Sequence, residues 1–180
     1  MNAATPLSIR QACTADLPAI TAIYGVQVDA SVSTYEVDRP DLAEMQRRMD
    51  AIVAQGYPYL VAERDGQVAG YAYVSSYRAR RAYRFTVENT VYVDSAQQGR
   101  GVGTALLEAL IDTCAQLGFR QMIAVIGEAA NAGSVRLHER LGFRTVGVFQ
   151  GIGRKHGRWL DTLQMQRALG DGDASDPLDE

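Results

Sequence analysis

The chain has few of the residues that build covalent or metal-bound scaffolds. Its 180 residues include only two cysteines, Cys13 and Cys114, and two histidines, His138 and His156, and their spacing matches no zinc-binding pattern. Cys114 falls within an apolar helical pattern, so we interpret it as a reduced packing residue. These shortages argue against a disulfide-rich scaffold and against a structural metal site.

Long apolar runs and a targeting segment are also missing. No stretch approaches the length of a membrane span, and the first ten residues, MNAATPLSIR, have neither the basic nor the apolar region of a secretory signal. Hydrophobic residues make up 47% of the chain and charged residues 22%, which is typical of a globular protein. We therefore expect a cytoplasmic protein with no membrane partner.

The formal net charge of −3 is concentrated at the end of the chain. Five of the 21 acidic residues lie in residues 170–180, so residues 1–169 carry 16 acidic against 18 basic residues. The final segment lacks the apolar side chains that could offset its ordering entropy, and we predict a disordered acidic tail. Residues 1–169 form the expected single domain, whose mild basicity suits a small anionic ligand better than a long nucleic acid.

Apolar periodicity and turn residues predict the element order β-α-α-β-β-β-α-β-α-β-β. The Asp65-Gly66 pair is the strongest hairpin signal. Strands are expected over residues 8–12, 59–64, 67–77, 84–94, 121–126, 144–150 and 159–167. Helices are expected from Thr14, and over residues 42–55, 102–117 and 134–141. This order predicts an α/β (α+β) fold with a central, mixed, mostly antiparallel sheet flanked by helices.

A glycine-rich loop, QQGRGVG, occupies residues 97–103 between a predicted strand and a predicted helix. A dinucleotide fingerprint would need glycine or alanine where this chain has Thr104, and a P-loop would need a lysine, whereas the only lysine is Lys155. A flexible turn is the remaining plain interpretation. Glycines at a helix start expose backbone N–H groups at the positive end of the helix dipole, and Arg100 adds a charge, so the loop is typical of an anion site.

The same loop carries a family signature. Residues 98–103, QGRGVG, resemble the Q/R-x-x-G-x-G/A motif of the GCN5-related N-acetyltransferases (GNAT). The segments TVENTVYVDSAQQGRGVG, AVIGEAANAGSVRLHERLGF and GIGRKHGRW resemble the phosphinothricin and methionine sulfoximine N-acetyltransferase branch, over about Ser8 to Leu169. The resemblance implies a homodimeric enzyme without a metal that moves an acetyl group from acetyl-CoA to the α-amine of a small glutamate-like amino acid, by direct attack in a ternary complex.

The resemblance also implies where acetyl-CoA is bound. The glycine loop and the start of its helix would hold the pyrophosphate, and strand backbone would pair with the pantetheine arm and polarise the carbonyl. Asn131 would hydrogen-bond the same arm, although asparagine is also a common helix cap. The implied set comprises Val91, Tyr92, Val93, Gln98, Gly99, Arg100, Gly101, Val102, Gly103, Thr104, Asn131 and Ser134.

Glu88 is an unusual carboxylate within an apolar and hydroxyl-bearing strand. Alternation puts it on the strand face of Thr86, Thr90 and Tyr92. Five strand steps of ~3.3 Å separate Glu88 from Val93, which is about 17 Å and comparable with an extended pantetheine arm. The resemblance implies that Glu88 is the general base, acting directly or through water. A solvated or arginine-paired side chain is the alternative.

His138 is the second candidate catalytic residue. It belongs to the motif RLHE, which resembles that of the phosphinothricin branch, and residues 131–142 contain no tyrosine that could serve as the general acid found in many other members. The resemblance implies an acid or proton-relay role for His138. A partly buried packing histidine is the alternative.

Four arginines interleaved with aromatic residues lie within residues 78–84. An RNA-binding strand could have this composition, but a sequence pI of about 5.4 and the unexplained glycine loop argue against it. Guanidinium groups bind carboxylates through two parallel hydrogen bonds. The expected substrate-binding residues, implied by the resemblance, are Arg78, Arg80, Tyr83, Ile126 and Lys155, the last in a predicted turn.

The acceptor is not identified by these residues, which do not distinguish phosphinothricin from methionine sulfoximine or methionine sulfone. Two further functions stay open from the sequence. One is acetyl transfer to another amine, such as a peptide N-terminus or a polyamine. The other is a non-catalytic module that binds CoA or RNA.

Overall fold

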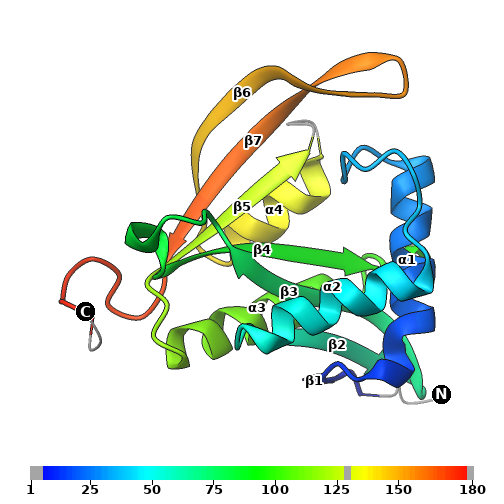
Figure 1. The fold of residues 1–180 in the computed structure, drawn as a ribbon, viewed down its shortest axis with the longest axis horizontal. Coiled ribbons are helices and arrows are strands. Elements are labelled where there is room, and N and C mark those ends of the chain that lie inside the picture. The colour runs from blue at the N-terminus through cyan, green and yellow to red at the C-terminus, as the bar shows by residue number, and fades with distance from the viewer. Residues whose placement is uncertain (1–5, 128–130, 178–180) are drawn as a thin grey trace.

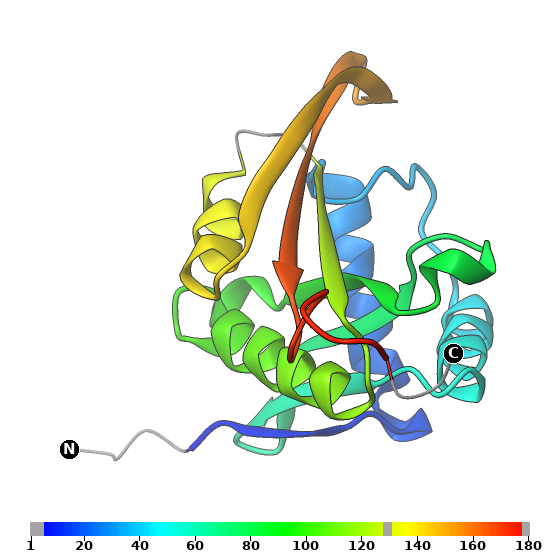
Figure 2. The same cartoon turned by 90° about the vertical axis from the view of Figure 1, so that its left-hand side faces the viewer.

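The computed structural model describes residues 6–127 and 131–177, and within them seven strands form one sheet with helices on both faces (Figures 1 and 2). The helices are α1 (Leu17–Ala30), α2 (Leu42–Ala54), α3 (Val102–Gln116) and α4 (Ala132–Arg140). The strands are β1 (Ser8–Gln11), β2 (Tyr59–Arg64), β3 (Gln67–Ser76), β4 (Thr86–Val93), β5 (Gln121–Gly127), β6 (Arg144–Lys155) and β7 (Arg158–Ala168). Short 3-10 turns lie at Thr14–Asp16, Arg81–Tyr83 and Ser95–Gln97.

The strands are ordered β1-β2-β3-β4-β5-β7-β6, and only the β4–β5 pair in this described sheet is parallel. The expected α/β fold, element order and mostly antiparallel sheet are therefore confirmed. The β2–β3 hairpin turns at Asp65 and Gly66, whose φ angles of 53° and 72° are the left-handed pair that Asp-Gly favours.

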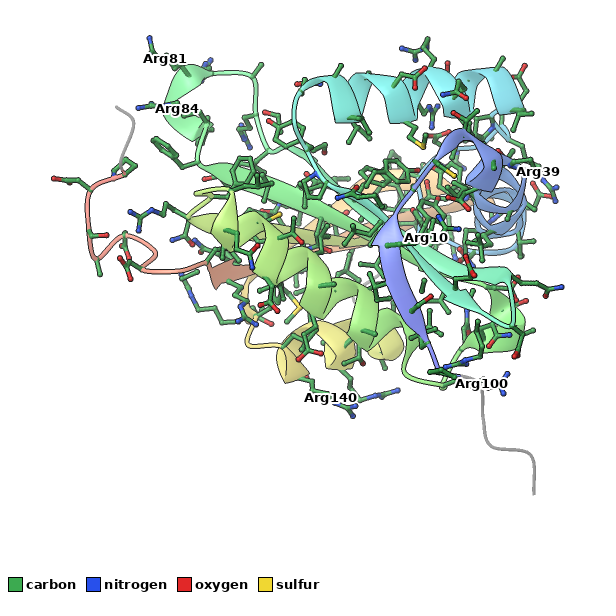
Figure 3. The ribbon with its side chains drawn as sticks, turned by 90° about the horizontal axis from the view of Figure 1, so that it is seen from below. Arg10, Arg39, Arg81, Arg84, Arg100 and Arg140 are labelled. Atoms are coloured by element: carbon green, nitrogen blue, oxygen red, sulfur yellow. The ribbon has the colours of Figure 1, made fainter. Side chains whose placement is uncertain are left out.

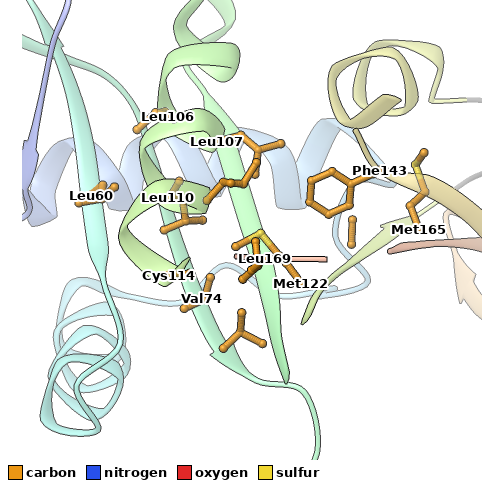
Figure 4. Close-up of a cluster of buried hydrophobic side chains, with 14 of the residues drawn as sticks. Leu60, Val74, Leu106, Leu107, Leu110, Cys114, Met122, Phe143, Met165 and Leu169 are labelled. Atoms are coloured by element: carbon orange, nitrogen blue, oxygen red, sulfur yellow. The ribbon is translucent and has the colours of Figure 1, made fainter. Parts of the chain in front are cut away.

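One face of the sheet is covered by α3 and α4 (Figure 3). The apolar stripe of α3, including Leu106, Leu107 and Leu110, packs on Met122 of β5 together with Phe143 (Figure 4). Cys114 lies in the same cluster and is free and buried, in agreement with the packing role expected for it (Figure 4). The apolar period of α3 thus fixes which side of the helix faces the sheet.

The other face is covered by α1 and α2, whose buried residues include Leu17, Ile20 and Met49. Beneath these helices, strand alternation brings tyrosine rings from β2, β3 and β4 together. Tyr59 stacks on Tyr73 with ring centroids 4.9 Å apart. This aromatic layer supports the face of β4 that carries Glu88.

Strands β4 and β5 pair only at their beginnings, where Thr86–Asn89 lie beside Gln121–Ala124. Beyond these residues β4 continues along β3 as far as Val93, whereas β5 continues along β7 as far as Gly127. Each strand therefore follows its own antiparallel partner, and the two diverge (Figure 1). The sheet opens between them.

The β6–β7 hairpin is longer than the sequence predicts. The sequence pattern predicts that β6 ends near residue 150, but the strand runs to Lys155 across a register shift between Phe149 and Gly153. The turn is His156-Gly157, with φ angles of 50° and 77°. Lys155 is therefore a strand residue with 4% of its surface exposed, and its assignment to a turn is wrong.

The acidic segment beyond the domain begins after β7, and the structure describes it as far as residue 177. The Arg120 guanidinium donates to the Asp176 carbonyl oxygen (2.9 Å), the Ser175 hydroxyl (3.1 Å) and the Gly172 carbonyl oxygen (3.3 Å). Beside these bonds the chain forms turns and bends over residues 170–175, and residues 178–180 lie outside the described residues. Disorder of the acidic tail stays a prediction. None of the described helices has the length and apolar character needed to span a bilayer.

Candidate active site

A cavity of about 770 Å³ occupies the opening between β4 and β5. Its walls come from the ends of these two strands, from Ser33–Tyr35 between α1 and α2, from the glycine loop and from α4. Glu88, His138 and most of the predicted cofactor-binding residues line it. The divergence of β4 and β5 therefore creates one site from segments that are far apart in the sequence.

The glycine loop forms one end of this cavity. Gly99 and Gly101 have φ angles of 70° and 82°, values that favour glycine, and Gly101 is the N-cap of α3. The first helical bond runs from the N–H of Ala105 to the carbonyl of Gly101 (3.0 Å). Because no side chain from the described residues caps the helix, the N–H groups of residues 102–104 are free to bind an anion.

The free edge of β4 forms the floor of the cavity. The N–H of Asp94 donates to the Ala69 carbonyl in β3 (3.0 Å), so alternation turns the N–H and C=O groups of Val91 and Val93 to the opposite edge, which β5 has left. Tyr92 instead directs its backbone groups toward Tyr71 of β3. Val91 and Val93 are thus able to pair with an extended ligand.

Glu88 lies at the point where β4 and β5 separate, and its side chain is half-buried. Burial raises the pKa of Glu88 above its ordinary value of 4.5. No ion pair within the described residues involves Glu88, so the alternative of an arginine-paired carboxylate is wrong within this part of the chain. An unpaired, partly desolvated carboxylate is suited to accepting a proton.

His138 lies on the other face of the sheet from Glu88, because it projects from α4 and contacts the neighbouring strand residue Asn89. Its Nε2 atom is 3.1 Å from Asn89 Oδ1, and its Nδ1 atom is 2.8 Å from the Ser134 carbonyl oxygen. The side chain is buried, with 4% of the residue exposed. Burial lowers the pKa of His138, and the bond to the Ser134 carbonyl acts in the opposite direction.

The structure brings most of the predicted cofactor residues together. Arg100 is the exception, since it is exposed outside the cavity and donates to Gln97 Oε1 (3.1 Å). Asn131 lines the cavity and also caps α4, accepting a hydrogen bond from the Ser134 N–H (3.3 Å). Its side-chain amide also donates to Ser33 Oγ (3.4 Å), so Asn131 caps α4 and also joins it to the Ser33–Tyr35 wall of the cavity.

The predicted substrate residues are less concentrated. Ile126 lines the cavity, whereas Arg78, Arg80 and Tyr83 do not, and the Arg78 guanidinium lies over the Tyr83 ring at 6.0 Å from its centroid. Lys155 borders a separate cavity of about 450 Å³ at the hairpin tip. Its Nζ atom donates to the Thr34 carbonyl oxygen (2.9 Å), and burial lowers its pKa.

The wall formed by Ser33–Tyr35 was not predicted, because its sequence is polar and lacks a recognisable period. The Tyr35 hydroxyl donates to the Asp161 carbonyl (3.1 Å) and lies 2.6 Å from the Thr162 hydroxyl of β7. A Cβ atom on Gly153 would lie 2.6 Å from the Tyr35 ring. Glycine at position 153 leaves room for the Tyr35 ring. This sequence feature can be interpreted only when the position of the β6–β7 hairpin is known.

Three comparisons bear on this site. Residues 21–143 match the Acetyltransferase (GNAT) family. A phosphinothricin N-acetyltransferase of Alcaligenes faecalis is 48% identical over 90% of this chain and 82% of its own length. An L-methionine sulfoximine/L-methionine sulfone acetyltransferase of Pseudomonas paraeruginosa is 45% identical over 90% of this chain and 94% of its own.

Solved structures agree with these matches. The crystal structure of a GNAT superfamily phosphinothricin acetyltransferase from Sinorhizobium meliloti in complex with AcCoA is 49% identical and superposes with a TM-score of 0.93. The match covers 96% of this chain and 94% of that one. A cavity with a free strand edge, a helix start with free backbone N–H groups and a carboxylate fits the same cofactor. The chain belongs to the GNAT acetyltransferase family and is an acetyl-CoA-dependent N-acetyltransferase.

Proposed function

We propose that this enzyme acetylates the α-amine of a small glutamate-like amino acid of the phosphinothricin, methionine sulfoximine or methionine sulfone type. The named relatives act on such acceptors by their descriptions. The observation that carries the proposal is the unpaired, half-buried Glu88 at the point where β4 and β5 separate. The reaction is direct attack within a ternary complex, with donor and acceptor on either side of this opening.

The donor side is supplied by β4 and α3. The free N–H groups at residues 102–104 bind the pyrophosphate of acetyl-CoA, and the edge groups of Val91 and Val93 pair with the pantetheine arm. A backbone N–H directed at the thioester carbonyl stabilises the negative charge that develops on its oxygen. These groups are fixed by the sheet and need no rearrangement during the reaction.

Glu88 takes a proton from the acceptor's ammonium group, directly or through water. The freed amine nitrogen forms a bond to the thioester carbonyl carbon and then loses a second proton to water. A neutral amide results as the carbon–sulfur bond breaks and the thiolate leaves with the electron pair. The raised pKa of Glu88 makes it a better proton acceptor than an exposed glutamate. Burial therefore favours the chemistry.

His138 is the proposed proton donor to the leaving thiolate. It lines the cavity from α4, on the side of the glycine loop. Both of its ring nitrogens contact oxygen atoms, those of Asn89 and Ser134, so proton release breaks one of these contacts. Because burial lowers the pKa of His138, loss of its proton is expected to limit kcat from below the ordinary histidine pKa of 6.5 upward. A His138→Gln variant that loses this basic limb of the kcat–pH profile supports the role, and an unchanged limb overturns it.

We also propose that the enzyme is a homodimer assembled on the projecting β6–β7 hairpin (Figure 2). β6 is an edge strand with open backbone groups, and Phe149, Ile152 and Trp159 on the hairpin are exposed at 50%, 58% and 68%. A long, exposed, apolar edge strand such as β6 favours pairing with the same edge of a second copy of the chain. Light scattering is expected to give the dimer mass, and an Ile152→Glu variant the monomer mass.

The central experiment measures thiol release from acetyl-CoA with a panel of amines. We expect turnover with glutamate-like amino acids and none with a peptide N-terminus or a polyamine. Glu88→Gln is expected to lower kcat about 100-fold or more, the usual share of a general base, while its affinity for acetyl-CoA is unchanged. Glu139→Gln, an exposed glutamate outside the cavity, serves as the matched control. Full turnover in Glu88→Gln would remove Glu88 from the base role.

A further inference from the structure

Two arginines of α4 line the cavity without a role in the reaction described above. Arg136 and Arg140 are four residues apart, so they lie on one flank of the helix, one turn from each other. Leu137 lies beside them and packs against the glycine loop, since its Cδ2 atom is 3.4 Å from where a Cβ atom on Gly103 would be. Arg136 and Arg140 therefore belong to the part of the cavity wall where α4 meets that loop.

The side of α4 that carries Arg136 and Arg140 is exposed, whereas the side that carries His138 faces β4. His138 contacts Asn89 on the sheet side, whereas Arg136 and Arg140 are exposed. Figure 3 shows Arg140 on the side of the sheet covered by α3, where Arg100 of the glycine loop also projects. The arginine pair is thus directed away from Glu88 and toward the outer end of the cavity.

The charges of this pair are not balanced by protein groups in the part of the chain that the structure describes. No carboxylate there forms an ion pair with Arg136 or Arg140, and that includes Glu139 on the same helix. On α2, by contrast, the same four-residue spacing pairs Arg48 with Glu44 at 2.7 Å. Like charges one turn apart repel each other, and a bound anion would relieve this repulsion.

Acetyl-CoA carries two anionic groups, a pyrophosphate and a 3′-phosphate on the ribose. The free N–H groups at the start of α3 account for the pyrophosphate in the proposed function, on which this inference rests. We propose that Arg136 and Arg140 bind the 3′-phosphate and so select acetyl-CoA over a donor that lacks it. Guanidinium groups suit a phosphate monoester because they donate two parallel hydrogen bonds to its oxygens.

The test compares acetyl-CoA with acetyl-3′-dephospho-CoA as donors for the full-length enzyme. Arg136→Ala and Arg140→Ala are each expected to raise KM for acetyl-CoA about tenfold or more, as for the loss of one charge-assisted hydrogen bond, with kcat unchanged. KM for the dephosphorylated donor is expected to stay at its wild-type value. In the double variant the two donors become equivalent. Arg47→Ala on α2, across the sheet, is the control for loss of one positive charge.

Two outcomes overturn the proposal. If the arginine variants raise KM equally for both donors, the arginines bind the pyrophosphate and not the 3′-phosphate. If KM is unchanged for both donors, the arginines do not contribute to donor binding. Calorimetric titration of CoA and 3′-dephospho-CoA gives the same comparison without an acceptor. If no amine is acetylated, the proposed acceptor class fails, while the titration still decides the role of Arg136 and Arg140.

Discussion

The Nε2 atom of His138 lies 3.1 Å from the Oδ1 atom of Asn89, and this contact joins α4 to β4 where β4 and β5 begin to diverge. The Asn89 amide also donates to the Ile123 carbonyl oxygen in β5 (3.0 Å). One buried side chain therefore connects three elements of the active site. Its amide is held in a single orientation, because only the nitrogen can donate to the carbonyl.

Asn89→Ala is expected to destabilise the fold by about 1–3 kcal/mol, because it removes the side-chain partner of the Ile123 carbonyl and of the His138 Nε2 atom in a buried site. Urea unfolding measures this change. The variant is also expected to lower kcat more than it raises KM for acetyl-CoA, since His138 loses its orientation. A fall in stability with wild-type kcat would mean that the Asn89–His138 contact is structural only.

Glu88 links activity to stability through its raised pKa. As the pH rises above 4.5, the Glu88 carboxyl group loses its proton in the unfolded chain but keeps it in the folded protein. The folded state therefore becomes progressively less stable relative to the unfolded state, until the pH exceeds the pKa of Glu88 in the folded protein. Glu88→Gln is therefore expected to raise Tm at pH 8 relative to wild type and to give no such gain at pH 4. Thermal unfolding at both values checks this, with Glu139→Gln as the control. An equal gain at both pH values would contradict it.

Arg64 of β2 supports the glycine loop from behind. Its guanidinium donates to Gln97 Oε1 (3.0 Å) and to the Arg100 carbonyl (3.4 Å), and it does not line the cavity. Arg64→Met is expected to raise KM for acetyl-CoA several-fold at unchanged kcat, because the loop proposed to hold the pyrophosphate loses two hydrogen bonds that fix its position. Initial-rate kinetics measure both constants. Arg144→Met is a suitable control, since Arg144 lies on β6 at the far edge of the sheet.

The hairpin and the Ser33–Tyr35 wall meet at Gly153. Gly153→Ala would place a methyl group 2.6 Å from the Tyr35 ring, and such overpacking costs about 1–3 kcal/mol. We expect a higher KM for the amino acid and an unchanged KM for acetyl-CoA, because the Ser33–Tyr35 wall shifts while the β4 edge and the glycine loop, proposed to hold the donor, do not. Gly147→Ala on the same strand is the control, since nothing lies within 4 Å of its Cβ position. Identical effects of both substitutions would exclude a specific role for the Tyr35 contact.

Much of the site is predictable from local patterns. The glycine loop has the spacing of a helix start that binds anions, and the polar residue Glu88 is conspicuous in an apolar strand. Both line the cavity, as do all of the predicted cofactor residues except Arg100. These features depend on interactions within one strand–loop–helix unit, which short sequence patterns describe well.

Other features depend on segments that are distant in the chain. Lys155 was expected in an exposed turn, but its ammonium group is buried against the Thr34 carbonyl, 121 residues away. The role of Asn89 also depends on α4 and β5, which follow it in the sequence. Such contacts have no local period or motif.

The sequence by itself determined the order of the elements, the glycine loop at the start of a helix and the strand that carries Glu88, because hydrophobic period and glycine placement act over a few residues. Only the tertiary structure decided that β4 and β5 separate after Asn89 and Ala124. That separation arises because β4 follows β3 while β5 follows β7. Because each strand follows its own antiparallel partner, the edge of β4 beyond Asn89 is left unpaired. The cavity along this edge is lined by both the glycine loop and Glu88.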